Sequence, residues 1–191
     1  MEKIIRRIFD DSIAVKRNVV KNLVSEIEIS ARIMIDVLKQ GNKLLICGNG
    51  GSAADSQHFA AELVMRFEKN RPALPAIALT TDSSNITACG NDFGYDVVFE
   101  RQVEGLGREG DVLIAITTSG NSNNLVRALE IAKRKGMKTI CLNGKSGGKM
   151  NDLDLDSNLI VEGNNTARIQ ESHITIIHTW CKLIEDTIFE D

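Results

Sequence analysis

The sequence lacks any run of about 18 consecutive apolar residues, the length that a membrane-spanning helix requires. It also lacks the continuous apolar segment of a signal peptide, because its first residues, MEKIIRRIFDDSIAVKRN, mix charges of both signs. Basic residues are not in excess either, since the formal net charge is −3. We therefore expect no membrane span, and no nucleic-acid or membrane partner bound through a broad basic face.

Paired cysteine motifs are also missing. The four cysteines lie far apart without any CxxC spacing, three of them inside apolar runs: Cys47, Cys89, Cys141 and Cys181. This pattern indicates reduced, mostly buried thiols rather than disulfides or a cysteine metal site. Reduced thiols are typical of the cytoplasm, where we expect the protein to be located.

No internal repeat, low-complexity tract or linker divides the chain, and its two prolines lie together at 72–75. The 191 residues, 42% hydrophobic and 26% charged, are enough for one domain with its own core. We predict a single domain over residues 1–191.

Residues 2–40 form a long helical pattern in which apolar residues recur at intervals near three and four. Asp10-Asp11-Ser12 suggests a break with Ser12 as a cap, and Gly41 suggests the end of the pattern. We expect residues 1–41 to be an arm that packs on a partner subunit. The alternative is that this arm only covers one edge of its own domain.

After the arm, short apolar runs alternate with helical patterns. The runs lie at 43–48, 75–80, 111–118, 137–143 and 157–163, and the helical patterns at 52–67, 121–136 and 166–190. Short, continuously apolar strands separated by helices are typical of a parallel sheet covered on both faces. We therefore predict an α/β fold, a doubly wound sheet of five parallel strands, with ligands bound at the carboxyl ends of the strands.

The stretch TTSGNSNN follows the third predicted strand and precedes a helix. Its hydroxyl side chains, the tight turn at Gly120 and the free N–H groups of the following helix suit a phosphate monoester. The chain has no GxxxxGK[ST] motif, so this is not a nucleotide P-loop. The alternative is an ordinary Ser/Asn-rich helix cap. The candidate hydroxyls are those of Thr117, Thr118, Ser119 and Ser122.

The stretch GNGGSAAD follows the first strand in the same way. Gly48, Gly50 and Gly51 allow the backbone to approach a ligand closely, and Ser52 is placed to cap the helix or contact a hydroxyl. A dinucleotide GxGxxG motif requires glycine where Ala53 stands, so the dinucleotide signal is weak.

Two further polar pairs come next. His58 and Glu62 are four residues apart, which places them on one helix face, suited to metal binding or proton transfer. An isolated pair of this kind is more often a surface ion pair. Asn91 and Asp92 lie beside a glycine in NDFGYD, where they either contact substrate hydroxyls or serve the turn.

The last helical pattern, RIQESHITIIHTW, carries Gln170, His173 and His178 among isoleucines. Histidines on a core-facing helix are more often packed and hydrogen-bonded than ligands. We expect His173 to have this structural role.

Together, GNGGSAADSQHFAAEL, the Asn-Asp pair of CGNDFGYD, TTSGNS and RIQESH with its later histidine resemble the bacterial phosphoheptose isomerases. This is a family of SIS-domain enzymes, and the resemblance covers essentially the whole chain. It implies a flavodoxin-like three-layer sandwich and conversion of sedoheptulose 7-phosphate to D-glycero-D-manno-heptose 7-phosphate, the first step towards the heptose of lipopolysaccharide and other surface glycans. It also implies a cytoplasmic homotetramer with active sites between subunits and one zinc ion per subunit.

The resemblance further implies the residues of the site. Zinc ligation is implied for His58, Glu62, Gln170 and His178. Substrate contacts are implied for Asn49, Gly50, Gly51, Ser52, Glu62, Asn91, Asp92, Thr117, Thr118, Ser119, Ser122 and Gln170. Thr117 stands where serine is common in the family, which preserves the hydroxyl.

Ketose–aldose isomerisation moves a proton between C1 and C2 through an enediol, so it needs a base near the carbons and an acid near the oxygens. We assign Glu62 as the base and His178 as the acid. Gln170 and His178 are separated by roughly 12 Å along a straight helix. One metal held by both requires a bent helix, a long side-chain reach or a contribution from another subunit. The rival hypothesis is a SIS-domain protein that associates with the bacterial replication initiator and has no enzymatic activity.

Overall fold

The computed structural model describes residues 1–189 and contains a parallel five-stranded sheet in the order β2-β1-β3-β4-β5. The strands are β1 (Leu44–Gly48), β2 (Ala76–Ala78), β3 (Val112–Ile116), β4 (Lys138–Gly144) and β5 (Ser157–Val161). Four of these strands lie within the predicted apolar runs, and β4 extends one residue beyond its run, to Gly144. The strand order is that of a doubly wound flavodoxin-like sheet, which confirms the predicted fold class.

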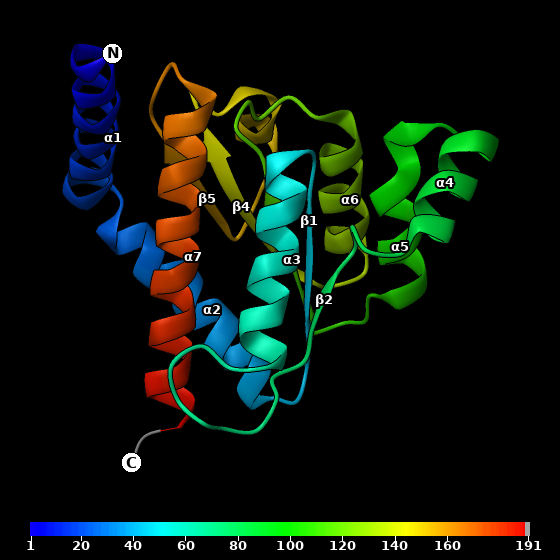
Figure 1. Ribbon diagram of the computed structural model, residues 1–191. Coiled ribbons are helices and arrows are strands. Elements are labelled where there is room, and N and C mark those ends of the chain that lie inside the picture. The colour runs from blue at the N-terminus through cyan, green and yellow to red at the C-terminus, as the bar shows by residue number, and fades with distance from the viewer. Residues whose placement is uncertain (190–191) are drawn as a thin grey trace.

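Helices cover both faces of the sheet, as Figure 1 shows. One face packs against α2 (Val24–Lys39), α3 (Gly51–Val64) and α7 (Thr166–Ile188), and the other against α4 (Ser83–Asp92), α5 (Val98–Leu106) and α6 (Asn123–Arg134). Side chains of β3 alternate between the two cores, with Ile114 on the first and Leu113 on the second. The strands are therefore apolar on both faces, which explains their continuous apolar runs. Within the described residues, no helix has both the length and the apolar character needed to cross a membrane.

The N-terminal arm consists of α1 (Glu2–Asn22) and α2, which meet at Leu23. The break expected at Asp10-Asp11-Ser12 is wrong, because α1 continues through these residues and the Ser12 hydroxyl accepts a hydrogen bond from Lys16. The expected end near Gly41 is confirmed, since α2 ends at Lys39 and Gly41 has a φ of +80°. Together, α1 and α2 run alongside α7 (Figure 1).

Several short elements were not anticipated from the sequence. These are α4, α5 and the 3-10 helices η1 (Tyr95–Val97) and η2 (Gly148–Asp152). The start of α4 does carry a signal, because the Asp82 side chain accepts a hydrogen bond from the backbone N–H of Asn85.

The direction of winding reverses between β1 and β3. Gly48 pairs with Ile116, so both strands end at the same level. The turns that follow them, GNGGS and TTSGNS, therefore emerge side by side at the topological switch point, where ligands of this fold class bind.

Candidate active site

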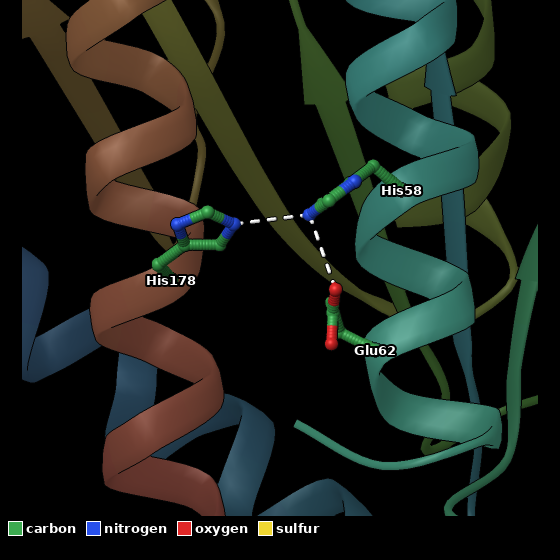
Figure 2. A group of neighbouring side chains, drawn as sticks. All are labelled: His58, Glu62 and His178. Carbon is green, nitrogen blue, oxygen red and sulfur yellow. Dashed lines mark hydrogen bonds and ion pairs between the residues drawn. The ribbon is translucent and has the colours of Figure 1, made fainter. Parts of the chain in front are cut away.

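Three side chains from two helices meet between α3 and α7 (Figure 2). The Nε2 atom of His58 lies 3.0 Å from Nε2 of His178 and 3.2 Å from Oε1 of Glu62. His58 and Glu62 are one helical turn apart on α3, as expected for one face, whereas His178 comes from α7, 120 residues away from His58. The His58 side chain is 45% exposed and that of Glu62 is 23% exposed, so solutes can reach the group.

The surroundings of this group include two residues that sequence reasoning missed. The ring of Phe67 lies 5.5 Å from the ring of His178, centroid to centroid. Asp55 precedes His58 by one turn on α3, and its Oδ2 is buried without a hydrogen-bond partner among the described residues. Burial raises the pKa of Asp55, and the nearby His58 opposes this effect. The 55–58–62 spacing, which puts all three residues on one helix face, is the sequence signal that would have identified Asp55.

The donor atoms of the group fit a divalent metal. One ligand atom each from His58, Glu62 and His178 lie within 4.8 Å of one another. Imidazole nitrogen and carboxylate oxygen are ligands that zinc accepts, and a site with three protein ligands leaves a position for water or substrate. The residues present therefore suit a catalytic rather than a closed structural metal site.

Gln170 lies elsewhere along α7. A Cβ atom at Gly51 would come within 2.3 Å of its Nε2, so the glutamine amide packs directly on the N-terminus of α3. Along α7, which is one continuous helix over Thr166–Ile188, His178 follows Gln170 by about two turns. The Gln170 amide thus contacts the glycine turn, and its role as a metal ligand stays a prediction.

The turn after β1 is fixed by an amide pair. Asn49 and Asn124 exchange two side-chain hydrogen bonds of 3.0 and 2.9 Å, and the Tyr95 hydroxyl donates to Asn49 Oδ1 at 3.1 Å. Gly50 has a φ of +58° and is the N-cap residue of α3, so the first of the two alternatives for Ser52, that it caps this helix, is wrong. Ser52 is itself buried. Asn124 and Tyr95 were missed because each acts through a contact distant in sequence.

The turn after β3 presents hydroxyls and a helix N-terminus. Thr117 is buried, and its Oγ1 accepts a hydrogen bond of 3.2 Å from the Gly120 N–H, which orders the turn. Thr118 and Ser119 are partly exposed, and Ser122 is the N-cap residue of α6 without capping through its side chain. The Ser122 hydroxyl therefore remains available to a ligand at the positive end of α6.

Asn91 and Asp92 are the last two residues of α4, and both are exposed. The Asn91 amide donates to the Asp92 carboxylate at 2.7 Å. Tyr95, three residues after Asp92, donates a hydrogen bond from its hydroxyl to Asn49, so this segment approaches the glycine turn from the other face of the sheet. Their contact with substrate stays a prediction.

His173 has the structural role expected for it. It is fully buried, and its Nε2 lies 2.8 Å from the Asn143 carbonyl oxygen at the end of β4. Burial lowers the pKa of His173 to about 4, while the hydrogen bond to the carbonyl opposes this shift. His173 is thus a neutral donor that joins α7 to the sheet.

Comparison with known proteins identifies relatives over nearly the whole chain. A family model described as "SIS domain" matches residues 8–144. The phosphoheptose isomerase of Aliarcobacter butzleri is 55% identical over 170 residues, 89% of either chain, and that of Shewanella loihica is 50% identical over 183 residues, 95% of this chain and 93% of the relative. The structure of the phosphoheptose isomerase from Neisseria gonorrhoeae superimposes with a TM-score of 0.91 at 46% identity, covering 97% of this chain and 98% of that one. A phosphoheptose isomerase structure from Francisella tularensis superimposes with a TM-score of 0.93 at 43% identity, covering 96% of this chain and 97% of that one. The chain belongs to the phosphoheptose isomerase family of SIS-domain proteins.

Proposed function

We propose that the chain is an aldose–ketose isomerase that converts sedoheptulose 7-phosphate to D-glycero-D-manno-heptose 7-phosphate. This reaction is the first step of ADP- or GDP-heptose biosynthesis for lipopolysaccharide or surface glycan. The observation that carries the proposal is the meeting of Glu62 with His58 and His178 between two helices of a chain whose relatives are phosphoheptose isomerases.

The reaction needs one proton moved between carbons and one between oxygens. Glu62 removes a proton from C1 of the ketose while His178 donates a proton to the C2 oxygen, which gives the enediol. The proton held by Glu62 is then delivered to C2, and the C1 hydroxyl proton is returned to His178, which gives the aldehyde. Both groups end as they began, and no redox cofactor is consumed.

Substrate binding is assigned to the two turns at the sheet edge. We assign phosphate binding to the hydroxyls of Thr118, Ser119 and Ser122 and to the N-terminus of α6, where Ser122 is the N-cap residue. We assign the hydroxylated chain of the substrate to the backbone of the glycine turn, with Asn49 and Gln170. Binding energy at the distant phosphate then positions the reacting carbons against Glu62.

We assign one zinc ion per subunit to His58, Glu62 and His178, with Gln170 as the fourth predicted ligand. The donor atoms of His58, Glu62 and His178, which lie within 4.8 Å of one another, support the assignment of these three. A ring nitrogen that binds zinc carries no proton, so His178 would act as the acid only while that nitrogen is not bound to the metal. A bound metal would polarise the carbonyl oxygen of the substrate.

We also propose a homotetramer with active sites at subunit interfaces. The apolar face of α1 supports self-association, because Ile4, Ile5 and Phe9 are 54%, 55% and 65% exposed. A groove of about 700 Å³ lined by α1, α2 and α7 continues this face. All four cysteines are buried free thiols, in keeping with the proposed cytoplasmic location.

The test is turnover of sedoheptulose 7-phosphate by purified, zinc-supplied protein in D2O, followed by NMR. We expect an aldose phosphate that carries deuterium at C2, because Glu62 exchanges its proton with solvent. A folded protein that gives neither product nor exchange would contradict the proposal and favour the initiator-associating, non-enzymatic alternative. Light scattering measures the oligomeric state independently.

A further inference from the structure

Glu185 is a fully buried carboxylate on α7 that organises the loop after α3. Its Oε1 accepts a hydrogen bond from the Phe67 N–H at 2.9 Å, and its Oε2 accepts from the N–H groups of Glu68 and Lys69 at 2.9 and 3.0 Å. Burial alone raises the pKa of Glu185, but these three hydrogen bonds and Arg71 outweigh it and lower the pKa to about 2. The carboxylate therefore stays charged and holds three consecutive residues of the loop.

Arg71 connects this carboxylate to the end of α3. Its Nε donates to Glu185 Oε1 at 2.8 Å, its Nη1 to the Leu63 carbonyl at 2.7 Å, and its Nη2 to the Glu62 carbonyl at 2.8 Å. The Arg71 side chain is 2% exposed. One guanidinium thus binds two carbonyls of the last helical turn, including the carbonyl of the proposed base.

The network joins the two helices that carry the proposed acid and base. Glu185 follows His178 by two turns of α7, so both side chains lie on the same helix face. The backbone N–H that Glu185 binds belongs to Phe67, whose ring packs against the ring of His178 at 5.5 Å. Arg71 thus constrains the backbone of Glu62, and Glu185 constrains the ring of His178 by way of Phe67.

We propose that Arg71 and Glu185 are positioning residues for the isomerase reaction, which fix the separation and register of Glu62 and His178. This inference rests on the proposed function. Neither residue touches the reacting group. A guanidinium binds Glu185 and two carbonyls at once, whereas a lysine ammonium is a point charge that lacks this planar fork. Arg71→Lys therefore keeps the charge and loosens the geometry.

The chain offers a matched control. Asp111 is also a buried carboxylate, which accepts hydrogen bonds from the N–H groups of Lys43 and Arg108 at 3.0 and 2.8 Å and pairs with the Lys43 ammonium. It lies at the amino ends of β1 and β3, and none of these hydrogen bonds involves α3 or α7. Asp111→Asn weakens a comparable set of hydrogen bonds and an ion pair far from the proposed acid and base.

Steady-state kinetics and thermal unfolding of Arg71→Lys and Asp111→Asn form the first part of the test. We expect Arg71→Lys to lower kcat by about 10- to 100-fold with KM within about threefold of the parent, the cost of misplacing reacting groups. Asp111→Asn should lower the melting temperature without a comparable loss of kcat. A purely structural role would instead give Arg71→Lys the parent kcat with a lowered melting temperature, and this result would overturn the proposal.

A second measurement does not depend on activity. The chain has three histidines, so the ring NMR signals of His58, His173 and His178 can be assigned by single substitutions. We expect Arg71→Lys to shift the His178 signals and to leave His173, which binds Asn143, unchanged. If the parent has no activity, the proposed function fails, while unmoved His178 signals would separately overturn the positioning role.

Phe67→Leu keeps the test decisive if Arg71→Lys does not fold. It removes the ring that packs on His178 and leaves the Glu185–Arg71 pair intact. We expect a smaller loss of kcat, about three- to tenfold, and a shift of the His178 ring signals. Parent values of both would contradict the positioning of His178 through this loop.

Discussion

The turns at the carboxyl edge of the sheet and the face between α3 and α7 are built in different ways. At the sheet edge, ligand groups are largely backbone N–H groups and hydroxyls of two continuous segments, 48–52 and 117–122. The second segment is ordered by the local contact of Thr117 with Gly120, and the Asn49–Asn124 amide pair fixes the first. Between the helices, the groups are side chains 120 residues apart, such as His58 and His178. The first arrangement suits recognition of a fixed anion, and the second suits proton transfer by groups whose position is set by packing.

The different roles of the two regions are tested most directly by removing the proton-transfer groups between α3 and α7. Glu62→Gln and His178→Gln should each lower kcat by about 10²- to 10⁴-fold, because general acid–base groups contribute on that scale. The exposed helix carboxylate of Glu130 provides the control, and Glu130→Gln should leave kcat unchanged. Turnover by either site variant at the parent rate would remove that residue from its assigned role.

The second prediction tests the sheet edge alone. The double substitution Ser119→Ala and Ser122→Ala should lower kcat/KM for the phosphorylated ketose by about 10²- to 10⁴-fold, since each hydrogen bond to a charged group contributes about 1.5–3 kcal/mol. The same double variant should not change the slow turnover of unphosphorylated sedoheptulose. An equal loss with both substrates would mean that these hydroxyls act on the reacting end of the sugar.

The sheet edge was largely predictable from the sequence. VLIAI is apolar at every position because both faces of β3 are buried, and it is followed by polar residues where the strand ends. The 3.6-residue repeat also places His58 and Glu62 on one face. Both inferences use only local geometry.

The remainder depends on contacts between distant segments. The break between α1 and α2 occurs at Leu23, which carries no glycine or proline signal, whereas the polar residues near Ser12 simply lie on a solvated helix. The contact of His178 with His58 and the packing of Gln170 on Gly51 follow from how α7 lies along α3. No spacing along the chain encodes that arrangement.

The third prediction concerns His173, which ties α7 to the sheet between the two regions. Its pKa in the folded state is lowered to about 4 from an ordinary value of 6.5, so unfolding takes up a proton at pH values between these limits. The stabilisation is present above pH 6.5 and is lost as the pH falls towards 4. Because of this histidine, the unfolding free energy should therefore fall by roughly 2 kcal/mol as the pH is lowered from 7 to 5.

Denaturant unfolding at the two pH values measures this loss. His173→Gln retains a side-chain donor for the Asn143 carbonyl but does not titrate, so its unfolding free energy should fall by about 2 kcal/mol less over the same range. Glu185 does not confound the comparison, because its lowered pKa places its own effect below about pH 4.5. Equal pH slopes for the two proteins would show that His173 is not buried in its neutral form.

The smallest effect is expected where the two regions touch, at Gly51 and Gln170. A methyl group at Gly51 would come within 2.3 Å of the Gln170 Nε2, and since this is the end of a flexible side chain, the amide can move aside without unfolding the helix. Gly51→Ala should therefore lower kcat/KM by about tenfold, roughly 1.4 kcal/mol, with little change in melting temperature. Gly105→Ala is the control, since nothing lies within 4 Å of its Cβ position in α5 and alanine there should stabilise slightly. If Gly51→Ala retains the parent kcat/KM, the reaction does not need the Gln170 amide at its place on the glycine turn.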